Sequence, residues 1–196
     1  MNFVNHKHSI SAAVNMCSVV VEFEGFQLNP YDFIIKELAF YVIDYGYHAR
    51  WNFLPPFPWS ELSAKNKKMA AWLTRNFHGL RWESGDLPYS SCELILTSLL
   101  TSYKVIYTKG LEKTIFLERK SGRKIFNLDD LNCPKVTSLG SLQVKCPVHM
   151  LHFKHCALVK ASFYALYIKE TTFLPKVICV EDVNHRASQI VDEDKK

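Results

Sequence analysis

The stretch CSVVVEFEGF, residues 17–26, decides how the rest of the chain can be arranged. It combines β-branched and aromatic side chains, a composition that is typical of a β-strand. Its two carboxylates, Glu22 and Glu24, are two positions apart and therefore lie on one face of that strand. The fold depends on the elements that follow this strand, and the chemistry depends on what those elements bring to the two carboxylates.

Two further strands are predicted directly after the first. Asn29-Pro30 marks a turn, and residues 32–44, DFIIKELAFYVID, form a long apolar run that is interrupted by Lys36 and Glu37. The stretch HARWNFL, residues 48–54, ends at two prolines. The sequence therefore predicts an antiparallel meander of three strands.

Helices and strands alternate in the rest of the chain. Residues 61–77 predict a helix with Ser60 as its N-cap and Gly79 as its end, and its apolar face comprises Leu62, Met69, Trp72, Leu73 and Phe77. The later predicted elements are a helix over 90–103, a strand over 104–110, a helix over 111–120, a strand over 124–128 and a helix over 156–170.

This order predicts an α/β protein with a ribonuclease H-like mixed β-sheet, β-β-β-α-β-α-β-α, flanked by helices. The match requires that one of the two consecutive helices is an insertion or a misread element. We expect an N-terminal extension over 1–16, one domain over 17–170 and a C-terminal tail over 171–196. A chain of 196 residues, 48% of them hydrophobic, is long enough to bury a core of its own.

Composition limits the cellular setting. Neither a signal peptide nor an apolar run of membrane-spanning length is present, so we expect an intracellular protein that does not act in a membrane. The six cysteines are then thiols or metal ligands rather than disulfides. A net charge of +5 is compatible with a nucleic-acid partner, and equally with a solvated basic surface.

Glu22 and Glu24 lie where ribonuclease H-like nucleases carry their first metal-binding carboxylates, since two divalent cations hold the scissile phosphate. The segment TKGLEKTIFL resembles a motif of the DEDD exonucleases, but Lys113 stands at the position of the catalytic aspartate. In HCALVKA, which resembles the final motif, His155 matches the histidine and Lys160 replaces the aspartate. An active nuclease would use Glu22, Glu24 and His155. The alternative is a solvated strand face, because the partner carboxylates are missing.

The stretch CPVHMLHFKHC, residues 146–156, offers soft metal ligands in Cys146, His149 and Cys156. A fourth ligand can come from nearby or from Glu37, which needs a partner if it is buried in its apolar strand. The alternative is a buried thiol, a surface histidine and an outward-facing glutamate. Nearby candidates for the fourth ligand are Cys133, His152 and His155.

The segments FIIKELAFY and CPVHMLHFKHCAL resemble the Maelstrom domain, a ribonuclease H-like module of piRNA silencing that lacks the exonuclease carboxylates. The chain also resembles stand-alone arthropod proteins that share its KELA, PPFP, HGL and KG segments. The resemblance implies a structural zinc held by Glu37, Cys146, His149 and Cys156. It further implies single-stranded RNA and proteins of a silencing complex as partners, a place in the cytoplasm, in perinuclear granules or in the nucleus, and metal-independent cleavage of RNA.

The sequence therefore leaves three candidate functions: a zinc-stabilised domain that binds single-stranded RNA, an active DEDD-type nuclease, and a scaffold for proteins.

The first predicted helix carries four cations, which we interpret as a solvated face: Lys65, Lys67, Lys68 and Arg75. We interpret three tryptophans as core residues rather than stacking platforms: Trp51, Trp59 and Trp82. The predicted RNA-binding residues are Lys109, Lys113, Arg119, Lys120, Arg123 and Lys124.

Overall fold

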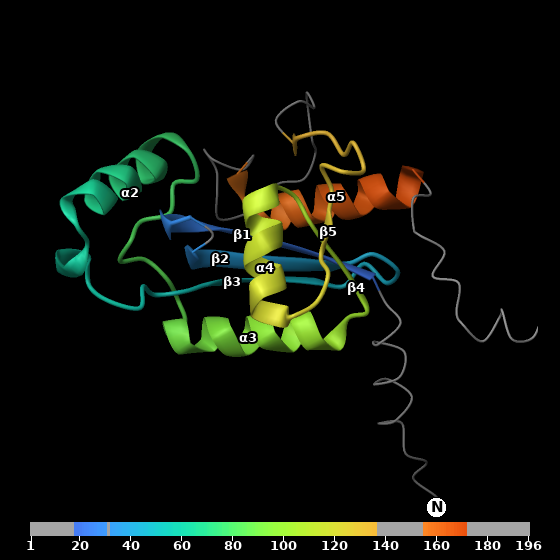
Figure 1. Ribbon diagram of the computed structural model, residues 1–196, viewed down its shortest axis with the longest axis horizontal. Helices are drawn as coiled ribbons and strands as arrows, with labels where there is room; N and C mark the ends of the chain where they lie inside the picture. Colours follow the sequence, from blue (N-terminus) through green and yellow to red (C-terminus); the bar gives the residue numbers. More distant parts are fainter. Residues whose placement is uncertain (1–17, 31, 137–154, 172–196) are drawn as a thin grey trace, which may run out of the picture.

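The computed structural model describes residues 18–30, 32–136 and 155–171 (Figure 1). The chain forms an α/β protein with a five-stranded mixed sheet in the order β3-β2-β1-β4-β5, consistent with ribonuclease H-like topology. The elements are β1 (Ser18–Asn29), β2 (Asp32–Val42), β3 (His48–Asn52), the 3-10 turn η1 (Trp59–Glu61), α2 (Ala64–Asn76), α3 (Tyr89–Ser102), β4 (Val105–Thr108), α4 (Leu111–Ser121), β5 (Phe126–Asn127) and α5 (Ala157–Thr171).

The pairing of the strands confirms the predicted meander. β1 pairs with β2, and β2 with β3, in the antiparallel sense, whereas β4 joins β1 and β5 joins β4 in parallel. The parallel strands are connected through helices, as such pairs must be. Both predicted consecutive helices exist, as α2 and α3, so neither of them is a misread element.

The helices cover both faces of the sheet. Val20 and Ala39 pack with α5 on one face, whereas Val21 and Leu38 pack with α3 and α4 on the other. α2 packs over the end of β1 that carries Phe26. Figure 1 shows α2 and α5 on one side of the sheet and α3 on the opposite side. None of the helices described is long and apolar enough to cross a membrane.

The start of α2 differs from the prediction. Ser60 lies in the 3-10 turn, and the N-cap is Ser63, whose hydroxyl accepts a hydrogen bond from the N–H of Asn66 at 3.2 Å. Pro58 begins this turn, so the chain completes it before the helix starts. The predicted apolar face was also wrong at one position, because Trp72 is exposed.

A β-bulge interrupts the ladder between β1 and β2. Glu24 pairs with Glu37, but Gly25 pairs with Ile35, so Lys36 is the extra residue. A Cβ at Gly25 would lie 2.0 Å from the carbonyl oxygen of Ile34, which explains the glycine. At the bulge, the backbones of β1 and β2 therefore approach each other more closely than a side chain at position 25 would allow.

Candidate functional site

Glu22 and Glu24 lie on the same face of β1, as the alternation predicts, but this face is not solvated. Their exposed fractions are 1% and 5%, because α5 packs across this part of the sheet. The interpretation of the two glutamates as a solvated strand face was therefore wrong. Sequence spacing places both carboxylates on one face, but only tertiary packing decides what covers them.

Lysines from two helices contact these carboxylates. Lys113 of α4 donates from Nζ to Glu22 Oε2 at 2.8 Å and to Glu24 Oε1 at 3.2 Å. Lys160 of α5 donates to Glu24 Oε1 at 2.5 Å. Two ammonium groups and two carboxylates thus form a neutral, largely buried cluster, which we call the Glu–Lys cluster.

Glu22 has further partners from β4. Its Oε1 accepts the backbone N–H of Lys109 at 2.7 Å and the hydroxyl of Thr108 at 3.3 Å. These bonds satisfy the carboxylate oxygen that Lys113 does not contact. Protein donors thus occupy both oxygens of this buried carboxylate.

The charges in the cluster stabilise one another. Burial alone would raise the pKa of Glu24, but Lys113 and Lys160 outweigh it and lower this pKa to about 2. Burial alone would lower the pKa of Lys113, yet Glu22 and Glu24 outweigh it and raise this pKa above its ordinary value. Glu24 and Lys113 therefore stay ionised at neutral pH.

Two cavities of about 470 and 490 Å³ open beside the cluster. Phe77, Lys109, Gly110, Lys113 and Lys160 line both of them. The first also reaches Glu24 and Leu73, and the second reaches Glu22 and Tyr164. A space that combines lysines with aromatic rings suits a ligand with phosphate groups and planar bases.

The two histidines near these cavities have different surroundings. His155, the predicted catalytic histidine, lines the second cavity, and its ring centroid lies 3.9 Å from that of Phe77. His78 donates from Nε2 to the carbonyl of Gly25 at 3.2 Å, while its Nδ1 accepts the N–H of Leu80 at 3.0 Å. Burial lowers the pKa of His78 to about 4, so this histidine is neutral and holds the loop after α2 against β1.

Glu37 forms a second polar centre on the same sheet face, directly across the ladder from Glu24. It is 1% exposed, so the interpretation as an outward-facing residue was wrong. Arg50 donates to Glu37 Oε1 at 3.0 Å, and the N–H of Ala157 donates to Oε2 at 3.1 Å. The thiol of Cys156 lies 3.5 Å from Oε1. We call Glu37, Arg50 and Cys156 the Glu37 centre.

Two of the four predicted zinc ligands, Glu37 and Cys156, therefore lie side by side, although they are 119 positions apart in sequence. The other two, Cys146 and His149, and the alternative ligand His152 lie outside the described residues. Within the described ranges, no three His, Cys, Asp or Glu side chains gather so that they could hold a metal ion. Cys133 and His155 thus do not complete a site with Glu37 and Cys156 among these residues.

Several residues of the predicted RNA-binding patch have internal partners. Lys109 donates to Asp129 at 2.6 Å and to the carbonyl of Cys133 at 2.5 Å. Arg123 donates to the carbonyls of Leu100 and Lys104 at the end of α3, each at 2.8 Å. Lys124 lies over the Phe126 ring, 5.3 Å from its centroid. Contact of this patch with nucleic acid remains a prediction.

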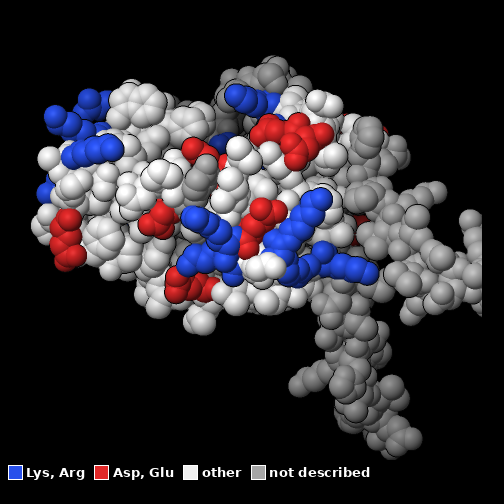
Figure 2. Space-filling model, in the orientation of Figure 1, with Lys and Arg blue, Asp and Glu red and all other residues white. Residues whose placement is uncertain are grey.

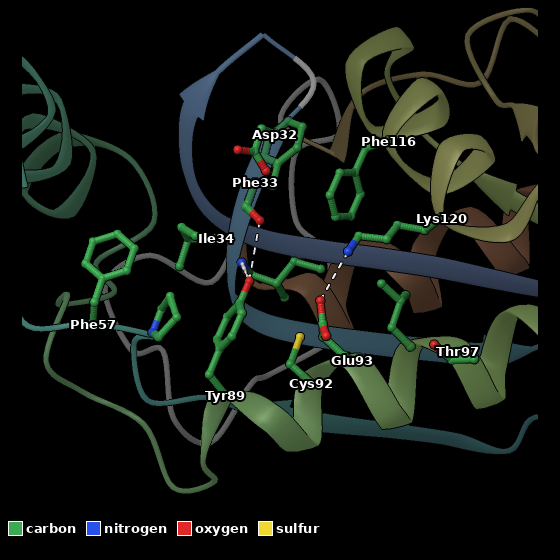
Figure 3. A pocket seen from close by; sticks show the side chains of 13 residues that line it. Asp32, Phe33, Ile34, Phe57, Tyr89, Cys92, Glu93, Thr97, Phe116 and Lys120 are labelled. Atoms are coloured by element: carbon green, nitrogen blue, oxygen red, sulfur yellow. Dashed lines mark hydrogen bonds and ion pairs between the residues drawn. The ribbon is translucent and has the colours of Figure 1, made fainter.

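A further cavity, of about 400 Å³, lies on the opposite face between β2, α3 and α4 (Figure 3). The hydroxyl of Tyr89 accepts the N–H of Ile35 at 3.3 Å and lies 3.5 Å from the carbonyl oxygen of Phe33. Lys120 reaches across from α4 to Glu93 of α3 at 3.2 Å. The contacts of Tyr89 cover the edge of β2 beyond the end of β3, and the Lys120–Glu93 ion pair joins α4 to α3.

Sequence reasoning missed the role of Lys36, which we treated as an interruption of an apolar run. Its side chain is buried, and its Nζ donates to the carbonyls of Trp82 and Ser84 at 2.6 Å each. Burial lowers its pKa to about 8. A lone lysine in an apolar strand is a signal for a bulge or a buried ammonium, but it does not identify the carbonyl partners.

Neither a scan against protein-family models nor a search of curated proteins finds a match for this sequence.

Proposed function

We propose that this protein is a Maelstrom-like, ribonuclease H-like domain that binds single-stranded RNA and does not cleave it through divalent metals. The Glu–Lys cluster carries this proposal. A two-metal centre requires concentrated negative charge, whereas the charges of Glu22 and Glu24 are balanced by Lys113 and Lys160 at 2.5–3.2 Å. The ammonium groups of Lys113 and Lys160 repel a divalent cation, and they occupy the carboxylate oxygens that would bind it.

Binding of a single strand is supported by the two cavities beside the cluster. Their volumes of about 470 and 490 Å³ are within the range of small-ligand sites, and lysines and aromatic rings share their walls. A net charge of +5 is compatible with a polyanionic partner. The Maelstrom resemblance adds small-RNA silencing, including the piRNA pathway, as the biological setting and the proteins of a silencing complex as further partners.

A structural zinc belongs to the same proposal. Zinc–sulfur and zinc–oxygen bonds of about 2.3 and 2.0 Å, set at the tetrahedral angle, place the two donor atoms roughly 3.5 Å apart. Cys156 Sγ and Glu37 Oε1 are separated by 3.5 Å, so these donors fit one tetrahedral ion. Cys146 and His149 would complete the set. Such an ion would hold the start of α5 against β2, and Arg50 would orient the carboxylate.

The test of function measures binding and cleavage on the same labelled strands. Single-stranded RNA and DNA are titrated at several salt concentrations, with magnesium, manganese or EDTA. We expect salt-dependent binding and no cleavage that requires a metal. Metal-dependent cleavage that is lost in Glu22→Ala/Glu24→Ala would instead establish an active nuclease. Absence of salt-dependent binding would favour a protein scaffold.

EDTA also separates the two kinds of cleavage. Products that persist in EDTA would indicate the metal-independent activity that the resemblance implies. We assign no residue to that reaction.

Zinc is tested by metal analysis of purified wild type beside Cys146→Ser and Glu37→Gln. Cys92→Ala is a matched control, because Cys92 is a buried thiol of α3 on the opposite face of the sheet. We expect about one zinc per chain in wild type and in the control, and a large loss in the other two variants. Wild-type protein without zinc would contradict the metal site and leave RNA binding to be judged by its own assay.

A further inference from the structure

The outward face of α2 combines cations with an exposed tryptophan. Lys65, Lys68, Trp72 and Arg75 follow one another at steps of three, four and three residues, which places them on one side of the helix. All four are exposed. The opposite side packs on β1 through Ala70, Met69 and Leu73. The four residues therefore form a surface ridge, which we call the α2 face.

The cations of the α2 face make no polar side-chain contact with the rest of the described residues. Among the residues that the structure describes, Lys65, Lys68 and Arg75 take part in no ion pair or side-chain hydrogen bond, and α2 itself contains no acidic residue. Lys67 differs, since it donates to the carbonyl of Ser60 at 3.0 Å. Figure 2 shows Lys and Arg side chains gathered over α2, whereas basic and acidic side chains alternate over α4.

Trp72 is also left without a structural role. It is 58% exposed, whereas Trp82 is buried and Trp51 stacks on Phe40. Its ring makes no aromatic contact within the described part of the chain. A large apolar ring on an exposed helix face, surrounded by unpaired cations, matches the stacking platforms of proteins that bind single strands.

We infer that the α2 face is the main contact surface for single-stranded RNA, with a base stacked on Trp72 and phosphates held by Lys65, Lys68 and Arg75. This inference rests on the proposed function and replaces the predicted α4–β5 patch as the principal contact. The face is about 15 Å long, since ten residues separate Lys65 from Arg75. Leu73 of α2 and Phe77, which directly follows the helix, line the cavity at the Glu–Lys cluster, so the helix that carries this face also borders that cavity.

The test compares two triple variants with the same change in charge. Lys65→Gln/Lys68→Gln/Arg75→Gln removes the cations of the α2 face. The matched control, Lys104→Gln/Arg119→Gln/Lys124→Gln, removes three exposed cations near the ends of α3, α4 and β5. We expect the α2 variant to weaken RNA binding about tenfold or more and to reduce the slope of log affinity against log salt by about 2. The control should change both quantities much less.

Trp72 gives an independent measurement. Trp72→Ala should lose roughly tenfold in affinity at every salt concentration with an unchanged salt slope, and Trp72→Phe should recover most of that loss. Acrylamide quenching of tryptophan fluorescence should decrease when RNA binds to wild type, and this protection should be absent in Trp72→Phe. Circular dichroism melting of each variant checks that the fold is retained, which the exposure of the four side chains predicts.

The outcomes separate this inference from the proposed function. If wild type binds no single strand, both are overturned. If wild type binds RNA, but only the control triple variant binds it more weakly, the proposed function stands and the assignment of the contact to the α2 face is overturned. If wild type binds anionic phospholipid vesicles through the α2 face and ignores RNA, the surface is real, but its partner is a membrane and the inference is overturned.

Discussion

The Glu–Lys cluster and the Glu37 centre lie on the same face of the sheet, and Glu24 and Glu37 face each other across the β1–β2 ladder. In the cluster, flexible lysines from two helices approach the carboxylates to 2.5–3.2 Å. In the Glu37 centre, a rigid guanidinium, a backbone N–H and a thiol share one carboxylate. The comparison shows that tertiary neighbours, and not the position on the strand, decide which donors satisfy a buried carboxylate.

The largest expected effect comes from breaking the Glu–Lys cluster. Lys113→Met leaves Glu22 without its only side-chain cation among the described residues, and Glu24 with Lys160 alone. We expect the free energy of unfolding at pH 7 to fall by about 3 to 5 kcal/mol, as measured by urea denaturation. The loss should shrink at pH 4, because without Lys113 the pKa of Glu24 is less depressed and its carboxylate can take up a proton. An equal loss at both values of pH would mean that packing, not charge, is responsible.

Acid titration is expected to have the next largest effect. The pKa of Glu24 is 4.5 in the unfolded chain and about 2 in the fold, so the unfolded chain binds the proton more readily. Its contribution to stability, about 3 kcal/mol, is present above pH 4.5 and lost as the pH falls towards 2. Stability curves of wild type and Glu24→Gln should lie closest together near pH 2, separate as the pH rises to 4.5, and keep a constant separation above it. A separation that does not change between pH 2 and 4.5 would contradict an ionised Glu24.

A smaller effect is expected at the Glu37 centre. Arg50→Met removes the guanidinium but leaves the N–H of Ala157 and the thiol of Cys156 on the carboxylate. We expect a loss of about 1 to 3 kcal/mol in protein that has been stripped with a chelator. The loss should decrease when zinc is added, because the metal would replace the missing charge. A loss that zinc does not change would separate this centre from metal binding.

The smallest effect tests how fully Glu22 is satisfied. Thr108→Val keeps the shape of a buried residue of β4 and removes its 3.3 Å hydrogen bond to Glu22. Since Lys109 N–H and Lys113 still bind the carboxylate, we expect a loss of about 1 kcal/mol or less in chemical denaturation. A loss as large as that of Lys113→Met would show that the hydroxyl is essential to the cluster.

Much of the fold could be predicted from the sequence because its signals are local. Alternation in residues 17–26 predicts β1 and places Glu22 and Glu24 on one face, and turn residues separate the elements that follow. The burial of these glutamates could not be predicted in the same way, since it depends on α5, which lies more than 130 positions along the chain. Lys113 and Lys160, the two lysines at the aspartate positions of the motifs that the sequence resembles, are the side chains that contact the carboxylates.

Other parts of the site depend on packing that no local pattern encodes. Trp72 was counted with the apolar face of α2, because tryptophan is usually core, yet its position on the helix points it away from β1. Glu37 could be expected to need a partner, but Arg50 reaches it only through the pairing of β2 with β3. Sequence reasoning preferred the cations of α4 and β5 to those of α2 as RNA-binding residues. The structure shows that Arg123, one of the preferred cations, already donates to two backbone carbonyls.

The bulge at Lys36 divides β2 into two half-strands that face different neighbours. Residues two apart on a regular strand point the same way, yet Ile35 joins the core beneath α3 and α4 while Glu37 points towards α5. Without the bulge, regular alternation through Lys36 would place Lys36 beneath α3 and α4 and turn Ile35 to the side that now holds the carboxylates. A single extra residue thus allows an apolar layer and an ionic layer to be built back to back from one short segment.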